Sequence, residues 1–400
     1  TRLSAAAGLG TAALMALFMA GLPEEDGRFG DLFADLQGGQ RELSPGLLAA
    51  LSETTSGRGA LDPRQGDADS AVRHLLSIGL LHALNPEVPR GAWRLGVPAM
   101  LWEAMAGIDA AVETPKKLPA GLRHTPMHAA LALEELALPD SVRTLHETLP
   151  ELLLSGGAAT LIVRGPQHNG RATLVRALAG RMALGTLEIT PARLEAGVLP
   201  QLGLLATLLG ALPLFHPELA PGEAWTLPEL PGWDGPVCVI LGRQGGIQGV
   251  GAERALTLRL PWPHKAARCQ LWLQHLPGAT LTSALRLRLT SGRLVAAARL
   301  TRVQAALAGH GVPTAADLRA ACRNLGSEAL EPMAQPVAAD GDWRHLVLPD
   351  YVVEELRTLV ARCRHREQLR EMVGVAIRDG LSAGVRALFK GSTGTGKTLA

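Results

Sequence analysis

The chain is poor in lysine, in closely spaced cysteines and in excess charge of either sign. Only five of its 39 basic residues are Lys, so a Lys at a motif position carries more weight than usual. None of the four cysteines has metal-ligand or redox spacing, which favours buried thiols in a reducing compartment. Because 37 acidic residues nearly balance the basic ones, the composition gives no strong sign of nucleic-acid or anionic-membrane binding.

Length and hydrophobicity leave room for several folded domains. The 400 residues, 47% of them hydrophobic, are enough for two or three domains with real cores. The apolar stretch Leu3 to Leu22 could indicate a signal peptide or a membrane span, but it is rich in Ala and Gly and runs directly into Glu24 and Glu25. We therefore expect a buried helix there, no membrane segment and a cytoplasmic protein.

An internal repeat organises the chain. The segment Leu136–Val142 (Leu-Ala-Leu-Pro-Asp-Ser-Val) recurs as Leu346–Val352 (Leu-Val-Leu-Pro-Asp-Tyr-Val), an offset of 210 residues from position 136 to position 346. Each copy is followed by a helix-like stretch, a short apolar strand and a Gly-rich loop. The two strands are expected at Thr160–Arg164 and Val385–Lys390. This offset is the size of one nucleotide-binding module with its lid, so the repeat predicts tandem modules.

The second Gly-rich loop has the pattern Gly-x4-Gly-Lys-[Ser/Thr] of a phosphate-binding loop. Its glycines let the backbone aim successive N–H groups at phosphate oxygens. Lys397 is expected to reach the β- and γ-phosphates of ATP as the catalytic cation, and Thr398 to offer its hydroxyl to Mg²⁺. The alternative, a glycine turn that happens to precede a Lys, is disfavoured by the apolar strand before the loop. The residues predicted to bind the nucleotide are Gly391, Ser392, Thr393, Gly394, Thr395, Gly396, Lys397 and Thr398.

The first Gly-rich loop, Gly165–Thr173, has lost the residues that this chemistry needs. Arg171 stands at the Lys position, where its bulkier forked head is a poor substitute. Ala172 stands at the Ser/Thr position and cannot hold Mg²⁺. The later strand expected at Ala211–Phe215 ends in His216 rather than in an acidic pair. We expect this module to be structural, with weak nucleotide binding left open and hydrolysis absent.

The region before the first module is expected to be mostly helical. Ser70–Leu84 has helical apolar spacing, Trp93–Pro98 could form a short strand or wing, and Ala99–Gly107 reads as another helix. Helices followed by a small β element suggest a winged-helix-like domain, and without a basic recognition helix protein contact is favoured over DNA. The Pro-containing stretch Pro115–Pro126 is expected to be a linker.

These patterns give an expected α/β architecture in three parts. Residues 1–130 form the helical, winged-helix-like region, and residues 131–335 form a P-loop NTPase module of αβα layers with a helical lid and a degenerate nucleotide site. Residues 336–400 begin a second P-loop module. In the first module, further strands are expected at Pro236–Leu241 and Arg254–Leu260, with three lid helices over residues 281–330.

The loop Gly391–Thr398, the Pro-x-Pro-x4-Arg segment from Pro261 to Arg268 and the expected helical lid resemble AAA+ ATPases. The wider layout is similar to a bacterial group of AAA ATPases with an N-terminal winged-helix-type region, a degenerate first module and an active second one. Segments Gly27–Gln37 and Trp343–Pro349 are similar to that group, some members of which are encoded with contractile injection systems.

This resemblance implies an ATP-driven machine that remodels or assembles a protein complex and works as a homo-oligomeric ring of six. It also implies an acidic pair, a polar sensor and an arginine finger in the second module, all expected beyond Ala400, since the chain is expected to be part of a longer protein. The protein substrate is not indicated. Two other functions remain open: a nucleotide-gated DNA-binding regulator, and a structural scaffold that does not hydrolyse ATP.

Overall fold

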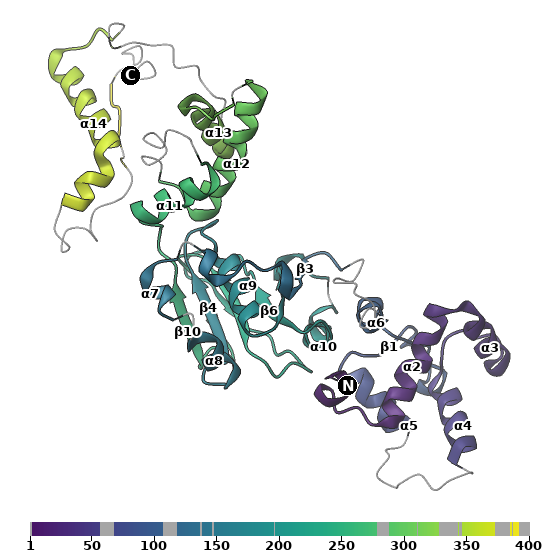
Figure 1. Ribbon diagram of the computed structural model, residues 1–400. Coiled ribbons are helices and arrows are strands. Elements are labelled where there is room, and N and C mark those ends of the chain that lie inside the picture. The colour runs from purple at the N-terminus through teal and green to yellow at the C-terminus, as the bar shows by residue number, and fades with distance from the viewer. Residues whose placement is uncertain are drawn as a thin grey trace. The chain divides into compact units, whose positions relative to one another are not determined.

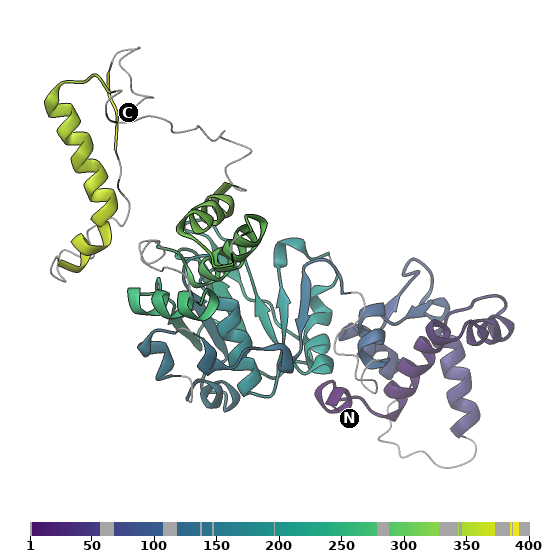
Figure 2. The ribbon, with the colours of Figure 1, turned by 45° about the horizontal axis from the view of Figure 1, so that its top comes forward.

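The computed structural model describes residues 2–56, 68–106, 118–136, 138–145, 148–195, 197–277, 288–309, 311–327, 343, 346–372, 385 and 387–391. The chain forms two compact units. The first comprises Thr1–His275 and Leu289–Ala296, and the second comprises Leu276–Arg288 and Ala297–Ala400. Figures 1 and 2 show the elements of both units.

The first unit begins with helices, as the sequence predicts. Helix α2 has apolar residues on all sides, and it buries Ala16 and Leu17 while Met15 and Phe18 stay more than half exposed. Among the described residues, no helix combines the length and the hydropathy that a bilayer crossing needs. The helices of this region are α1 (Arg2–Ala6), α2 (Thr11–Glu25), α3 (Gly27–Gln37), α4 (Pro45–Ser56), α5 (Ala68–Ser77) and α6 (Ala99–Ala106).

A small β element follows α5. Strands β1 (His82–Ala83) and β2 (Leu95–Gly96) pair antiparallel, and Leu43 forms a further bridge to Leu95. The helix expected over Ser70–Leu84 therefore ends earlier, at Ser77, because Gly79 takes a φ of +77° that turns the chain into β1. The strand expected within Trp93–Pro98 is confirmed.

The centre of the first unit is a six-stranded mixed sheet in the order β10-β4-β8-β6-β5-β3. All neighbours are parallel except β3 and β5. A second, two-stranded parallel ribbon joins β7 and β9. The strands are β3 (Leu122–Thr125), β4 (Thr160–Arg164), β5 (Gly185–Ile189), β6 (Ala211–Phe215), β7 (Ala224–Thr226), β8 (Val237–Leu241), β9 (Gly246–Gln248) and β10 (Ala255–Arg259).

Helices cover both faces of this sheet because its parallel strands are apolar on both sides. One core joins Leu161 and Val163 of β4 to α8 (Thr148–Leu154) and α9 (Arg171–Arg181). The other core joins Ile162 to α10 (Leu202–Leu209) and continues into the N-terminal helices. The expected αβα layering of this module is thus present, and α11 (Lys265–His275) follows β10.

Strand β3 corrects the expectation of a linker over Pro115–Pro126. Leu122–Thr125 pairs antiparallel with β5, and Arg123 donates a hydrogen bond to Glu188 across the pair. The strand is short and lies at the sheet edge, where partly exposed polar residues are tolerated. Its polar sequence gives no hydrophobic run, so sequence patterns missed it.

The second unit is helical where it is described. Helix α12 (Ser291–Leu307) begins in the first unit and runs into the second, where α13 (Ala315–Ser327) follows. Thr314 caps α13, since its hydroxyl accepts from the N–H of Asp317 while the Asp317 carboxylate accepts from the Thr314 N–H at 2.8 Å. Two of the three helices expected over 281–330 are thus present, at 291–307 and 315–327, and residues 278–287 and 328–330 lie outside the described residues.

Both copies of the internal repeat begin a helix at their Asp. Pro139 accepts hydrogen bonds from the N–H groups of the third and fourth residues after it, Val142 and Arg143, each at 2.9 Å. Pro349 accepts in the same way from Val352 at 2.9 Å and Val353 at 3.2 Å. The first copy starts α7 (Asp140–Arg143) and the second starts α14 (Asp350–Met372). The repeat is therefore one of backbone structure as well as of sequence.

The strand expected at Val385–Lys390 is not formed in its described residues, 385 and 387–390. Leu388 is 82% exposed and Phe389 is 45% exposed. A strand is stable only when neighbours pair with it. In the first module the two strands that pair with β4 are β8 and β10, and both come later in the sequence than β4. Residues 385–390 hold the position of β4 in the second module, and by this comparison no earlier strand of that module would pair with them.

Candidate functional site

The phosphate-binding loop predicted in the second module falls almost wholly outside the described residues. Only Gly391 is described, while the other seven predicted ligands of ATP and Mg²⁺, including Lys397 and Thr398, are not. Their roles stay predictions from the sequence. The matching loop of the first module is described in full, and its geometry can be compared with the requirements of the chemistry.

The first loop joins the end of an interior strand to the start of a helix. It leaves β4 at Gly165 and enters α9 at Arg171. Gly165 is required because a Cβ there would lie 2.6 Å from the carbonyl oxygen of Leu260. Gly170 has a φ of +75° at the start of α9, a conformation that favours glycine. The arrangement places the positive end of α9 at the carboxyl edge of the sheet, as in phosphate-binding loops.

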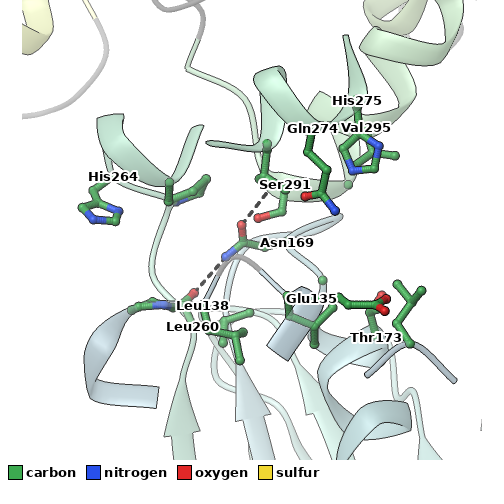
Figure 3. A pocket seen from close by; sticks show the side chains of 18 of the residues that line it. Glu135, Leu138, Asn169, Thr173, Leu260, His264, Gln274, His275, Ser291 and Val295 are labelled. Carbon is green, nitrogen blue, oxygen red and sulfur yellow. Dashed lines mark hydrogen bonds between the residues drawn. The ribbon is translucent and has the colours of Figure 1, made fainter. Parts of the chain in front are cut away.

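Side chain and backbone contacts fix the middle of this loop. The Asn169 side chain, 2% exposed, donates hydrogen bonds to the carbonyls of Leu260 at 3.2 Å and Pro261 at 2.7 Å. Its Oδ1 accepts from the N–H of Ser291 at 3.4 Å (Figure 3). The N–H of Gly292 donates to the carbonyl of His168 at 2.7 Å. The loop is therefore joined to the end of β10 and to the first turn of α12.

Arg171 directs its guanidinium to the protein backbone. It donates a hydrogen bond to the carbonyl of Leu241, which also accepts from the N–H of Gly165 at 3.3 Å. Burial lowers the pKa of Arg171, which is half-buried. The next residue, Ala172, has no oxygen with which to hold a metal. The guanidinium of Arg171 therefore binds the backbone at the end of β8. With Ala172 at the Ser/Thr position, the loop also lacks the hydroxyl that would hold Mg²⁺ there.

A charged cluster centred on Glu188 lies on the neighbouring strands. The Glu188 carboxylate accepts hydrogen bonds from Arg123 at 2.8 Å and from Arg176 of α9 at 2.7 Å. Burial would raise the pKa of Glu188, but the hydrogen bonds and charges of both arginines outweigh it, so that this pKa lies below its ordinary value. Glu188 is thus an ionised carboxylate with a structural role, and its charge is balanced by the two arginines. No sequence pattern marks Glu188, because its partners come from β3 and α9.

His216 occupies the end of β6, where a working module would carry its acidic pair. Its Nε2 lies 3.5 Å from Glu188 Oε2. Burial lowers the pKa of His216, and the charges of three arginines add to this against the opposing effect of Glu188. The imidazole is therefore neutral near pH 7 and lies half-buried beside Glu188. Within the described ranges, no group of three or more His, Cys, Asp or Glu residues could hold a metal ion.

We expect acid to destabilise the first unit partly through His216. Because its pKa in the folded protein lies below 6.5, the unfolded chain takes up a proton first, and the unfolding free energy falls as the pH drops below about 6.5. Replacing His216 by Gln should reduce the difference between urea unfolding at about pH 7 and at about pH 5.5. Glu188 does not interfere, since its lowered pKa keeps it ionised over that range. The exposed His264→Gln variant is the control and should keep the wild-type difference; an unchanged difference in His216→Gln would contradict the assignment.

A pocket of about 330 Å³ opens beside the first loop. It is mainly apolar, with Glu135 and Thr173 on one side and Gln274 and His275 on another (Figure 3). Pockets of this size bind small organic molecules. The residues that line it are Leu131, Glu135, Leu136, Leu138, Pro139, Asn169, Gly170, Thr173, Leu260, Pro261, Pro263, His264, Ala267, Leu271, Gln274, His275, Ser291, Gly292 and Val295.

Comparison with known proteins gives a likeness of fold at low sequence identity. No protein-family model matches the chain, and no curated protein sequence matches it. The FIGL-1 AAA domain is 11% identical with a TM-score of 0.35, over 59% of this chain and 90% of that one. A katanin structure is 12% identical with a TM-score of 0.36, over 50% of this chain and 87% of the other.

A third solved structure, a point mutant of RuvB from Thermotoga maritima, is 13% identical with a TM-score of 0.35, over 48% of this chain and 72% of its own. At TM-scores and identities this low, the likeness does not decide the function of this chain. The function is therefore argued from the residues themselves.

Proposed function

We propose that this protein binds and hydrolyses ATP in its second module, through the loop Gly391–Thr398, as an ATPase of the AAA+ type. The observation that carries the proposal is the complete phosphate-loop pattern in that loop, in a chain that uses only five Lys. The internal repeat supports it. In both copies the carbonyl of the Pro accepts hydrogen bonds from the first turn of a helix, and in the first module that helix is followed by a strand, a glycine loop and a further helix.

Two residues of this loop act on the transferred phosphate. The ammonium group of Lys397 binds the β- and γ-phosphate oxygens and stabilises the charge that develops as water attacks in line. The hydroxyl of Thr398 is the kind of hard oxygen ligand that Mg²⁺ prefers. When bound, Mg²⁺ neutralises the same phosphates. Backbone N–H groups of the glycines complete the cradle around the phosphates.

The first module serves as a scaffold in this proposal. Arg171 is bound to Leu241, Ala172 has no metal ligand, and neutral His216 replaces the acidic pair. Its loop and pocket still leave weak nucleotide binding open, with hydrolysis confined to the second module.

Restoring the loop residues of the first module should not restore its activity. In a protein already inactivated by Lys397→Ala, we expect Arg171→Lys with Ala172→Thr to leave ATP turnover at background, because β6 is followed by His216 and Pro217 instead of the acidic pair that positions metal and water. Steady-state phosphate release measures this. The same pair of substitutions with Lys397 intact is the control for folding and should turn over ATP normally. Recovery of turnover in the triple variant would mean that the first module needs only its loop.

The cellular role that we propose is to remodel or assemble a protein complex, as a cytoplasmic homo-oligomeric ring of six subunits. In this proposal the N-terminal region is a winged-helix-like domain that contacts protein partners, and the short β1–β2 pair after its helices supports this. Its α2 helix supports this, because Met15 and Phe18 are 56% and 57% exposed although helices that are apolar on all sides are normally covered. Near-neutral net charge favours protein over DNA as the partner.

A further inference from the structure

Three arginines gather at one side of the central sheet without a carboxylate partner. Arg164 ends β4 and Arg259 ends β10, and the parallel register places them directly opposite each other. Arg243 lies two residues after Leu241, the β8 residue that faces Arg164 from the other side. In the described part of the chain, none of the three arginines forms an ion pair, and all of them line one cavity of about 620 Å³.

This arrangement is unfavourable unless an anion is bound. Neighbouring strands lie about 4.8 Å apart, so the two paired arginines hold like charges at close range, which destabilises a sheet. The pKa of Arg164 is lowered by its burial and then by the charge of Arg259, with no carboxylate acting against either effect. Arg243 and Arg259 are exposed, so their guanidinium groups are accessible to a ligand.

Val142, Leu145 and Leu258 give the cavity an apolar wall beside a sheet edge, and Thr257 and Gly245 complete the lining. Val142 and Leu258 are buried in its wall, and Leu145 is 38% exposed at its surface. β10 is the outermost strand on this side of the sheet, where backbone N–H and C=O groups are not used by a neighbouring strand (Figure 1). A ligand for this cavity therefore combines negative charge with apolar groups, and an extended peptide could also use the strand edge.

We propose that this cavity binds an extended acidic segment of a protein partner, with its carboxylates on Arg164, Arg243 and Arg259 and an apolar side chain against Leu145. Guanidinium groups pair with carboxylates through two parallel hydrogen bonds, which suits such a ligand.

Two other anionic ligands fit less well. A single phosphate is much smaller than the cavity and makes no use of its apolar wall. A nucleic acid would run on across the adjoining ribbon, where the exposed Glu223 lies next to β9, since its carbonyl accepts from the N–H of Gly246 at 2.9 Å. The Glu223 carboxylate, which accepts a hydrogen bond from the N–H of Ala220 at 2.7 Å, adds negative charge beside the ribbon and so disfavours a long polyanion.

The test is binding of a short fluorescein-labelled peptide of alternating Glu and Leu to the 400-residue chain, followed by fluorescence anisotropy. We expect saturable binding that weakens with added salt, and a loss of about tenfold in affinity for each of Arg243→Gln and Arg259→Gln. The exposed Arg193→Gln variant is the matched control and should bind as wild type. Because both test arginines are exposed and unpaired, their replacement should leave the unfolding midpoint in urea unchanged or slightly raised.

Three results would overturn the proposal. The first is a peptide of alternating Lys and Leu that binds as well as the acidic one. The second is equal affinity of the acidic peptide for the wild type and for both arginine variants. The third is displacement of the peptide by equimolar inorganic phosphate or by a single-stranded oligonucleotide, which would assign the cavity to phosphate or to nucleic acid.

Discussion

ATP turnover by the protein should fall at least about a hundredfold when Lys397 is replaced by Ala. The loss is large because the ammonium group acts on the γ-phosphate in the transition state, where charge is developing. Replacement by Ala leaves only the backbone N–H groups of the loop to balance that charge. The measurement is steady-state phosphate release at saturating ATP and Mg²⁺.

The matched control for this variant lies in the first loop. Arg171→Ala changes the residue at the corresponding position, and we expect it to retain turnover, because its guanidinium contacts the carbonyl of Leu241. Turnover that survives in Lys397→Ala but disappears in Arg171→Ala would reverse the roles of the two modules. Loss in both variants would instead mean that the modules depend on each other for hydrolysis.

Replacing Asn169 by Ala should lower the unfolding free energy of the first unit by about 3 kcal/mol. The buried amide makes three hydrogen bonds. Its removal takes this hydrogen-bond partner from the carbonyls of Leu260 and Pro261 and from the N–H of Ser291. Water does not replace these hydrogen bonds, because Asn169 is only 2% exposed. Urea denaturation followed by tryptophan fluorescence measures the change.

Gln167→Ala provides the comparison for Asn169, because Gln167 is in the same loop but exposed. We expect its effect to remain within about 0.5 kcal/mol, as for most surface substitutions. If Asn169→Ala unfolds at the same urea concentration as wild type, the Asn169 side chain does not hold the loop. Its hydrogen bond to the start of α12 would then not stabilise the first unit.

The interior of the first module could be predicted from sequence because its strands are apolar on both faces. Thr160–Arg164 and Ala211–Phe215 are strands with the predicted bounds. Of the later two, β8 is one residue shorter than predicted at its start, and β10 is one residue shorter at each end. A short apolar run between turn residues is a local signal that needs no knowledge of the partner strand. The departures of the first loop from the phosphate-loop pattern, Arg171 and Ala172, are likewise local features of the sequence.

Features that depend on distant partners were not predictable in this way. β3 has no apolar run, and its pairing with β5 is supported by the ion pair of Arg123 with Glu188, 65 residues later. The pairing of Arg164 with Arg259 follows from the register of β4 and β10, which the sequence does not state. The strand expected at Val385–Lys390 was wrong for its described residues, since an apolar run forms a strand only with a partner.

The location of bound ATP tests the central claim most directly. Photo-crosslinking with azido-ATP and Mg²⁺, followed by digestion and peptide mapping, would show which module holds the nucleotide during turnover. We expect the label in the second module, from residue 336 onward, and its loss in the Lys397→Ala variant. Label confined to residues 131–335, and unchanged by Lys397→Ala, would contradict the assignment of the active site to the loop Gly391–Thr398.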